Sequence, residues 1–176
     1  MNEKELIQAC KKNVYSAQMQ VYHSYKNMMY NSSWRILKNR EDAEDAVQDS
    51  FIKGFEKIHQ IQNDANFGSW LKRIVINHSL DVLRKRKKIT WLDETFVLET
   101  ATNDTEKEED ITLSVKRIKE SLAEMKEKYR IVLVLYLIEN YTHKEISVQL
   151  QINESTVRNQ YKRGKEKLLQ LIKNKK

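Results

Sequence analysis

Apolar residues recur at helical spacing through residues 1–88. Over residues 14–37 they fall three and four positions apart, which is the period of a helix stripe that faces a core. Similar stripes cover residues 43–58 and 67–82, and a polar break separates the first two stripes. We therefore expect one compact helical unit in this part of the chain.

A second helical unit is expected over residues 113–176. Its first apolar positions, from Val115 to Met125, again follow the helix period. Residues 131–138 are almost without polar side chains, which for a helix predicts burial on most sides. The period is lost over residues 89–112, which we interpret as a flexible linker between the two units.

A helix-turn-helix is predicted inside the second unit. Thr142 followed by Glu145 matches a capping box, so a helix is expected over residues 143–150. After a short turn, Asn153 can cap a longer helix over residues 154–172. Two helices joined by about three residues, the second longer and basic, form this motif.

The composition favours helices throughout. The chain has no Pro and three Gly in 176 residues, so residues that interrupt helices are scarce. Its single cysteine, Cys10, can form neither an internal disulfide nor a cysteine zinc site. We expect an all-α fold of two small helical domains, without a metal or another cofactor.

No segment of the sequence predicts membrane insertion. Spanning a bilayer takes roughly 20 consecutive apolar residues, and no run approaches that length. The first residues lack the basic start and apolar core of a signal peptide. We therefore expect a cytoplasmic protein.

Charge divides the chain in the same places as the helical pattern. The net charge is +6 over residues 1–88, −7 over 89–112 and +8 over 113–176, which together make the total of +7. Two basic units on either side of an acidic linker suggest two modules that each meet a polyanion. Solvated helix faces with an accidental charge imbalance are the alternative that charge alone leaves open.

The last predicted helix has a face suited to a major groove. The polar residues point outward, because the inner side is formed by Val157, Tyr161, Gly164 and Leu168. Arginine can pair with guanine and asparagine with adenine, at roughly 1–3 kcal/mol of discrimination for each good bidentate pair. The outward residues are Ser155, Arg158, Asn159 and Lys162.

A second polar stripe follows the helix predicted over residues 67–88. It contains Arg73, Asn77, Asp81, Arg84 and Lys88. Trp70 falls beside this stripe, where its ring could stack on an unpaired base while the cations hold the nucleic-acid backbone. Alternatively, Trp70 and Phe67 fold under the preceding loop as core anchors.

The helix predicted over residues 43–58 has an acidic side instead. Asp42, Asp45 and Asp49 lie there with Gln48, opposite the apolar side that contains Phe51. This stripe is either solvated, with Asp42 as the helix N-cap, or it receives a basic protein surface.

Catalysis is weakly supported. His143 with Glu145, or His78 with Asp81, could be drawn as acid–base or metal pairs, but neither has a third ligand, and the chain has no Gly-rich phosphate loop. His78 falls on the apolar side of its helix, where a core histidine is expected. We expect His143 to be exposed, because it follows a cap.

The sequence resembles a known family in three segments. These are DAEDAVQDSFIKGFEKI at 42–58, FGSWLKRIVINHSLDVLRKRKK at 67–88 and YTHKEISVQLQINESTVRNQYKRGKEKL at 141–168. In order and spacing they are similar to regions 2 and 4 of extracytoplasmic-function sigma factors, which are transcription initiation factors. The resemblance leaves out only the N-terminal dozen residues and the linker.

The resemblance implies partners and roles for particular residues. Region 2 would bind core RNA polymerase through Asp42, Asp45, Gln48, Asp49 and Phe51. The loop at about residues 60–69 would capture a flipped base of the promoter −10 element, whose melted strand would meet Trp70, Arg73, Asn77, Arg84 and Lys88. Region 4 would read the −35 element through Ser155, Thr156, Arg158, Asn159, Lys162 and Arg163. Factors of this family are often held inactive by an anti-sigma factor, so such a partner is also expected.

The chain departs from the family pattern in places. A proline often found before the Tyr129–Arg130 pair is absent, Gly164 stands where alanine is usual, and Ser155 stands where glycine is common. Relative to alanine, Gly164 should weaken its helix by up to about 1 kcal/mol. A DNA-binding regulator that acts without polymerase remains the alternative function, since helix-turn-helix modules are widely shared. The first unit argues against it, because such a regulator needs no paired acidic and basic helices.

Overall fold

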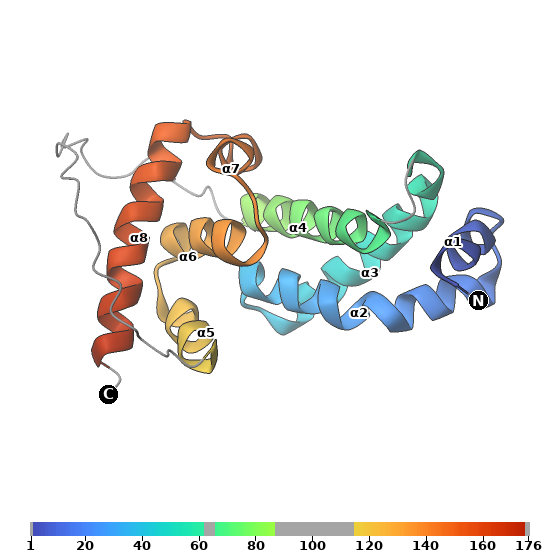
Figure 1. Cartoon of the computed structure of the whole chain (residues 1–176), viewed down its shortest axis with the longest axis horizontal. Coiled ribbons are helices and arrows are strands. Elements are labelled where there is room, and N and C mark those ends of the chain that lie inside the picture. The colour runs from blue at the N-terminus through green and yellow to red at the C-terminus, as the bar shows by residue number, and fades with distance from the viewer. Residues whose placement is uncertain (1, 62–65, 87–114, 175–176) are drawn as a thin grey trace.

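Every regular element of the described chain is helical. The computed structural model describes residues 2–61, 66–86 and 115–174 (Figure 1). The expected all-α fold is confirmed. The predicted linker over residues 89–112 lies outside the described residues, as does Lys88.

Long helices with short connections make up the first half. They are α1 (Glu3–Lys11), α2 (Tyr15–Leu37), α3 (Arg40–Lys57), the 3-10 turn η1 (Ile58–Gln60) and α4 (Phe67–Arg86). The chain leaves α2 at Lys38, whose φ of 51° is left-handed. Asn39 then caps α3, because its side chain accepts a hydrogen bond from the Asp42 N–H at 3.0 Å. The alternative in which Asp42 is the N-cap is therefore wrong.

The helices α1, α2, α3 and α4 share one apolar core. Its buried members include Ile7, Cys10, Val21, Met29, Phe51, Phe67, Leu71 and Val75. Burying a large apolar side chain contributes about 1.5–3 kcal/mol. Phe67 is fully buried and meets the Tyr25 ring edge-on at 5.6 Å between centroids. Of its two possible roles, Phe67 is thus a core anchor.

The second half contains the predicted helix-turn-helix. Its elements are α5 (Val115–Glu124), α6 (Glu127–Leu133), the π-helical turn η3 (Val134–Ile138), α7 (His143–Leu150) and α8 (Glu154–Asn174). The bounds of α7 and the start of α8 are as predicted, and α8 runs two residues further than expected. The apolar run is buried from Ile131 to Leu135, whereas Leu137 is 46% exposed.

The two halves share part of their cores. The first half contributes Ile36, Leu37, Ala46, Ile76, Leu80 and Leu83 to one buried cluster, and the second half contributes Ile131, Val132, Leu135, Tyr141, Ile146, Leu150 and Val157. In Figure 1, α6 and α7 lie between α8 and the ends of α2 and α4, and α2 contacts α6 while α4 contacts α7. Helical periodicity predicts that a face is buried but not which element covers it. The sequence therefore indicated two helical units but could not predict that they contact each other.

Candidate nucleic-acid interface

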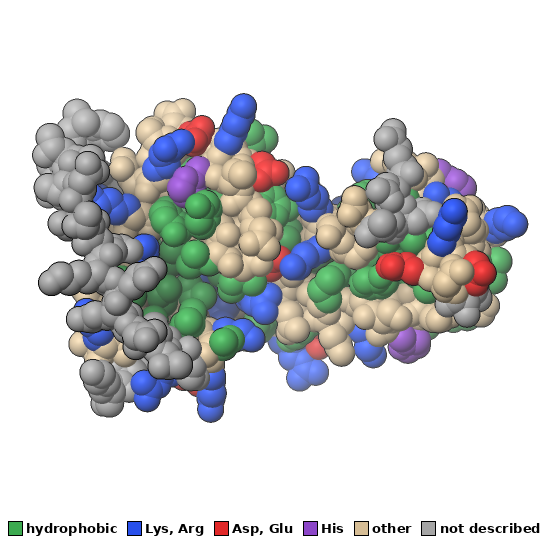
Figure 2. All heavy atoms as spheres, viewed as in Figure 1, with side chains coloured by type: hydrophobic (Ala, Val, Ile, Leu, Met, Phe, Trp, Pro, Cys, Tyr) green, Lys and Arg blue, Asp and Glu red, His purple; other side chains and the backbone are tan. Residues whose placement is uncertain are grey.

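The outer face of α8 is exposed as predicted. Val157, Gln160, Gly164 and Leu168 face inward and are buried. The exposed residues are Ser155, Arg158, Asn159, Lys162 and Arg163, and Thr156 is half-buried. Lys and Arg side chains project from both halves of the molecule in Figure 2. A helix with this face has the donors that read base edges in a major groove.

A capping box fixes where α7 begins. The Thr142 hydroxyl accepts a hydrogen bond from the Glu145 N–H at 3.2 Å, and the Glu145 carboxylate accepts one from the Thr142 N–H at 2.8 Å. The Thr142 N–H and the Thr142 hydroxyl, at 3.0 Å, both donate to the Glu145 carboxylate and lower its pKa. Gln151, at a left-handed φ of 56°, ends α7 and turns the chain toward α8. The predicted cap is confirmed.

The prediction that His143 is exposed is wrong. Its ring is half-buried, stacked at 4.5 Å on Tyr136 and tilted at 5.1 Å against Tyr161. Burial and the nearby charge of Arg158 lower the pKa of His143. The sequence could not show this contact, because Tyr136 and Tyr161 come from different helices. His143 thus packs α7 against α8.

Arg158 on α8 is paired within its own helix. Its Nε and one terminal nitrogen donate to the Glu154 carboxylate at 3.2 and 2.6 Å. This contact lowers the pKa of Glu154. Sequence reasoning missed Glu154, although the four-residue spacing of Glu and Arg could have indicated the pair. Glu154 therefore orients Arg158, one of the exposed cations of this face.

Several residues of the polar stripe on α4 already contact other side chains of the protein. The side chain of Arg73 is 65% exposed and pairs with Glu145 of α7 at 3.5 Å. Asn77 is half-buried in the crevice next to α7. Arg84 pairs with Asp81 at 2.7 Å. Arg73 and Asn77 therefore meet α7, whereas Arg84 is paired within its own helix.

Trp70 packs on the core that Phe67 anchors. The two rings stack at 5.9 Å, and Trp70 is half-buried. A side chain added at Gly54 of α3 would lie 3.8 Å from the Trp70 ring and 3.0 Å from Leu71. Gly54 therefore allows α3 and α4 to approach closely. Residues 62–65 of the loop before α4 lie outside the described residues.

The acidic side of α3 contains three exposed residues and one that forms an ion pair within the protein. Asp45, Gln48 and Asp49 are exposed, whereas Asp42 is half-buried and ion-paired with Arg86. Phe51 is 3% exposed, and its ring lies 4.9 Å from that of Tyr22 in the core. The face available to a partner therefore centres on the three exposed residues.

His78 lies between α4 and α3 as a polar bridge. Its side chain is 14% exposed, with Nε2 3.3 Å from Asp49 and Nδ1 2.8 Å from the Lys53 amine. Burial and the Lys53 charge lower its pKa. Asp81 is not among its close partners, and no cluster of three or more metal-ligating side chains occurs among the described residues. Nor is any described helix long and apolar enough to cross a membrane.

Comparison with known proteins assigns the chain to a family. Residues 21–89 match the family model described as sigma-70 region 2, and residues 116–168 match the model of sigma-70 region 4. The ECF RNA polymerase sigma factor SigW of Bacillus subtilis is 31% identical over 175 residues, covering 94% of each chain. The chain belongs to the ECF sigma factors. SigV of the same organism is 28% identical over 136 residues. The matched segment makes up 76% of this sigma factor and 78% of SigV.

Two solved structures have the same fold. CnrH, solved in complex with the cytosolic domain of CnrY, has a TM-score of 0.56 at 19% identity over 99% of both chains. The sigma factor RpoE of Bartonella quintana, solved with the anti-sigma factor NepR, has a TM-score of 0.54 at 19% identity and covers 88% of this chain. The exposed face of α8 and the stripe on α4 thus lie in the matched regions 4 and 2 respectively.

Proposed function

We propose that this sigma factor brings core RNA polymerase to promoters and starts transcription there. The observation that carries the proposal is the presence of regions 2 and 4, in that order, in one chain. A regulator that acts without polymerase would need region 4 alone, so that alternative is not favoured. Sigma factors are initiation factors and not enzymes, so we assign no reaction to the chain. We place it in the cytoplasm, where bacterial polymerase works.

Polymerase would bind the acidic side of α3. Asp45, Gln48 and Asp49 are exposed there and suit a basic protein surface. Asp42 would take part after exchanging its contact with Arg86. Since Phe51 is buried, we propose that it positions α3 and does not itself contact polymerase.

The two basic faces would bind the two promoter elements. Region 4 would read the −35 element through Ser155, Thr156, Arg158, Asn159, Lys162 and Arg163 on α8. Region 2 would hold the melted −10 strand through Trp70, Arg73, Asn77, Arg84 and Lys88. An inhibitory protein is the further partner we propose, by analogy with the complexes of CnrH with CnrY and of RpoE with NepR.

Charge reversal on α3 tests the polymerase contact. In Asp45→Lys with Asp49→Lys, we expect affinity for purified core polymerase to fall at least about tenfold, because like charges then face each other. The matched control is Glu120→Lys with Glu166→Lys, which reverses two exposed acids in region 4. Equal affinity of the two double variants would refute the α3 contact.

A second experiment separates DNA opening from polymerase binding. Trp70→Ala with Asn77→Ala should retain polymerase binding and lose open-complex formation, detected by permanganate reactivity of the −10 strand. Trp70 also packs on the core, so Asn77→Ala is measured alone as well. Unchanged melting in both variants would remove α4 from strand opening.

A further inference from the structure

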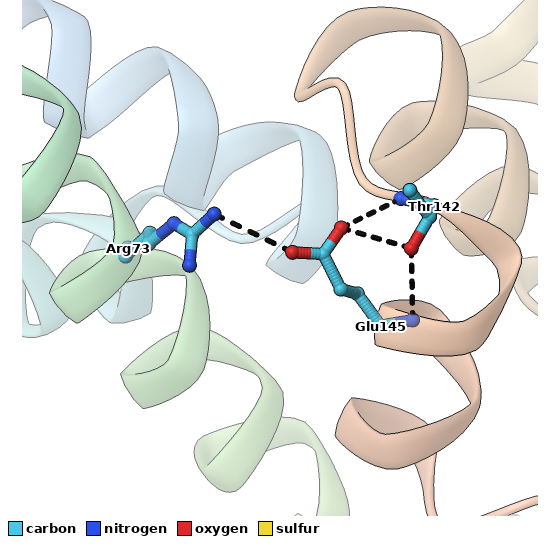
Figure 3. Close-up of polar contacts among 3 residues, drawn as sticks. All are labelled: Arg73, Thr142 and Glu145. Atoms are coloured by element: carbon cyan, nitrogen blue, oxygen red, sulfur yellow. Dashed lines mark hydrogen bonds and ion pairs between the residues drawn. The ribbon is translucent and has the colours of Figure 1, made fainter.

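The face of α4 proposed for the −10 strand is in contact with α7 and the turn before it. The guanidinium of Arg73 lies 3.5 Å from the Glu145 carboxylate (Figure 3) and 5.7 Å from the centroid of the Tyr141 ring. Asn77 lines the same crevice together with Lys144 and Val148. The buried Oδ1 atom of Asn77 has no hydrogen-bond partner among the described residues. Region 4 therefore occupies side chains that region 2 would use for DNA.

The chemistry of this contact resembles that of a bound single strand. A guanidinium binds a carboxylate through the same charge-assisted geometry as a phosphate, and it stacks on a ring as it would on a base. Glu145 thus meets Arg73 where a phosphate oxygen would, and Tyr141 offers the ring. Glu145 can do this while its other carboxylate oxygen caps α7 (Figure 3).

A buried carboxylate just before this turn ties region 4 to region 2. The Glu139 side chain is fully buried, with one oxygen 3.0 Å from the Ser32 hydroxyl and 3.5 Å from Arg35. Its other oxygen lies 2.9 Å from the Lys72 amine, in an ionic contact outside hydrogen-bonding geometry. Removing one partner from such a buried group is strongly destabilising, so Glu139 specifies this arrangement.

Arg130 supports the same arrangement from α6. Its guanidinium donates to the backbone oxygens of Arg35 at 3.3 Å and Ile36 at 3.1 Å, which are carbonyls at the end of α2. Burial lowers the pKa of Arg130. Together with the shared apolar cluster, these contacts join the halves through buried groups and not through surface charges alone.

We propose that residues 139–145 are an intramolecular competitor of the −10 strand, held against α4 by Glu139. This rests on the proposed function, because it concerns the same DNA-binding face. In this closed form the part of α4 that contains Arg73 and Asn77 is in contact with α7, while Asp45 and Asp49 on α3 are exposed. Polymerase can therefore bind first, and the −10 strand is accepted only after region 4 leaves α4.

The test uses glutamine variants of the full chain without polymerase. Glu139→Gln keeps the size of the side chain but loses its charge, and Glu145→Gln keeps a residue that still completes a capping box. The probe is a fluorescein-labelled random single strand of about 20 nucleotides, at about 50 mM salt, followed by anisotropy. The control, Glu120→Gln with Glu166→Gln, removes the same charge from exposed sites of region 4.

We expect the Glu139→Gln, Glu145→Gln double variant to bind the strand at least about tenfold tighter than the control pair, since apparent affinity rises with the open fraction. Adding Arg73→Ala and Asn77→Ala should abolish the gain, which would place the uncovered site on α4. Equal binding by a folded double variant and by the control would overturn the proposal. That result would leave polymerase-dependent transcription, and hence the proposed function, untouched.

A cross-link provides a measurement that does not depend on weakening the fold. In Arg73→Lys, carbodiimide should join the new amine to Glu145, giving a linked α4–α7 peptide in mass spectra. The same single-stranded probe, added in excess, should suppress the link. A missing link, or one that the probe does not reduce, would contradict competition at this face.

Discussion

The two surfaces proposed to meet DNA carry similar side chains with different neighbours, because the Arg73 and Arg158 side chains are both 65% exposed but only Arg73 pairs with a residue of another helix. On α8, Arg158 and Asn159 are exposed, and Arg158 pairs with Glu154 of its own helix. On α4, Arg73 and Asn77 lie against α7. The helix α7 contacts both helices, but it meets α8 on the side away from Arg158 and Asn159 and meets α4 at Arg73 and Asn77. A basic face with an asparagine is therefore ready for DNA only if the rest of the chain leaves it uncovered.

The largest effect is expected from Arg130→Met, which removes a buried contact between the two halves. The variant leaves carbonyl oxygens at the end of α2 without their donor and should lower the free energy of unfolding by about 3 kcal/mol. Urea denaturation followed by circular dichroism measures it. Arg117→Met, at an exposed site on α5, is the control and should change stability by less than about 0.5 kcal/mol. A small loss in Arg130→Met would mean that the halves are held together in another way.

The next effect concerns the exposed face alone. Arg158→Ala with Lys162→Ala should weaken binding to the −35 element by about 10- to 100-fold and lower the salt dependence of binding. Binding is measured by anisotropy on a duplex from a promoter that the factor transcribes. Lys173→Ala, at the exposed end of α8, serves as the control. Unchanged affinity for the duplex would remove α8 from recognition.

Gly164→Ala should have a smaller effect, on the packing of α8 against α6 behind the exposed face. An added Cβ would lie 3.2 Å from Leu133 and 3.3 Å from Cβ of Tyr129. Because α8 lies so close to α6, the neighbouring side chains would have to shift to make room for the methyl group. Overpacking of about 1–3 kcal/mol should exceed the gain in helix propensity of about 1 kcal/mol. We expect a net loss near 1 kcal/mol in urea denaturation. A stabilised variant would show that α8 can shift outward at little cost.

The smallest expected effect is a shallow pH dependence of stability. The pKa of His143 is lowered in the folded state, so the unfolded chain binds this proton more readily. The stability that the neutral ring contributes is complete above its usual pKa of 6.5 and is lost as the pH falls below it. Urea denaturation from about pH 7 to about pH 5 should show the loss.

His143→Phe is the variant for this dependence, since it keeps a ring between Tyr136 and Tyr161. It should flatten the fall in stability, whereas the exposed His23→Phe should retain it. Some slope should remain from His78, whose pKa is also lowered by burial. The same slope in both variants would contradict the packing role of His143.

Local sequence signals predicted most of the fold. Periodicity located the helices, and the Thr142–Glu145 capping box fixed the start of α7. Contacts between distant residues could not be predicted, because they depend on how helices pack. Asn39 was missed as the cap of α3, His143 was expected in solvent, and the burial of Glu139 had no local signal.

For the candidate site, the sequence identified the α8 face and the α4 stripe but not the contact of the α4 stripe with α7. Arg73 and Glu145 are 72 positions apart, so no periodic pattern connects them. The same limit applies to Phe51, which was grouped with a binding face although it is buried in the core. A helix position predicts a direction relative to its own axis, and the neighbouring elements determine what lies there.

Run-off transcription with purified bacterial core polymerase tests whether this chain starts transcription. The template is fragmented DNA from the source of this chain, and reactions with and without the sigma factor are compared. We expect discrete new transcripts that require the factor and are lost in Arg158→Ala with Lys162→Ala. DNA binding without any factor-dependent transcript would contradict this expectation and would favour a regulator that works without polymerase.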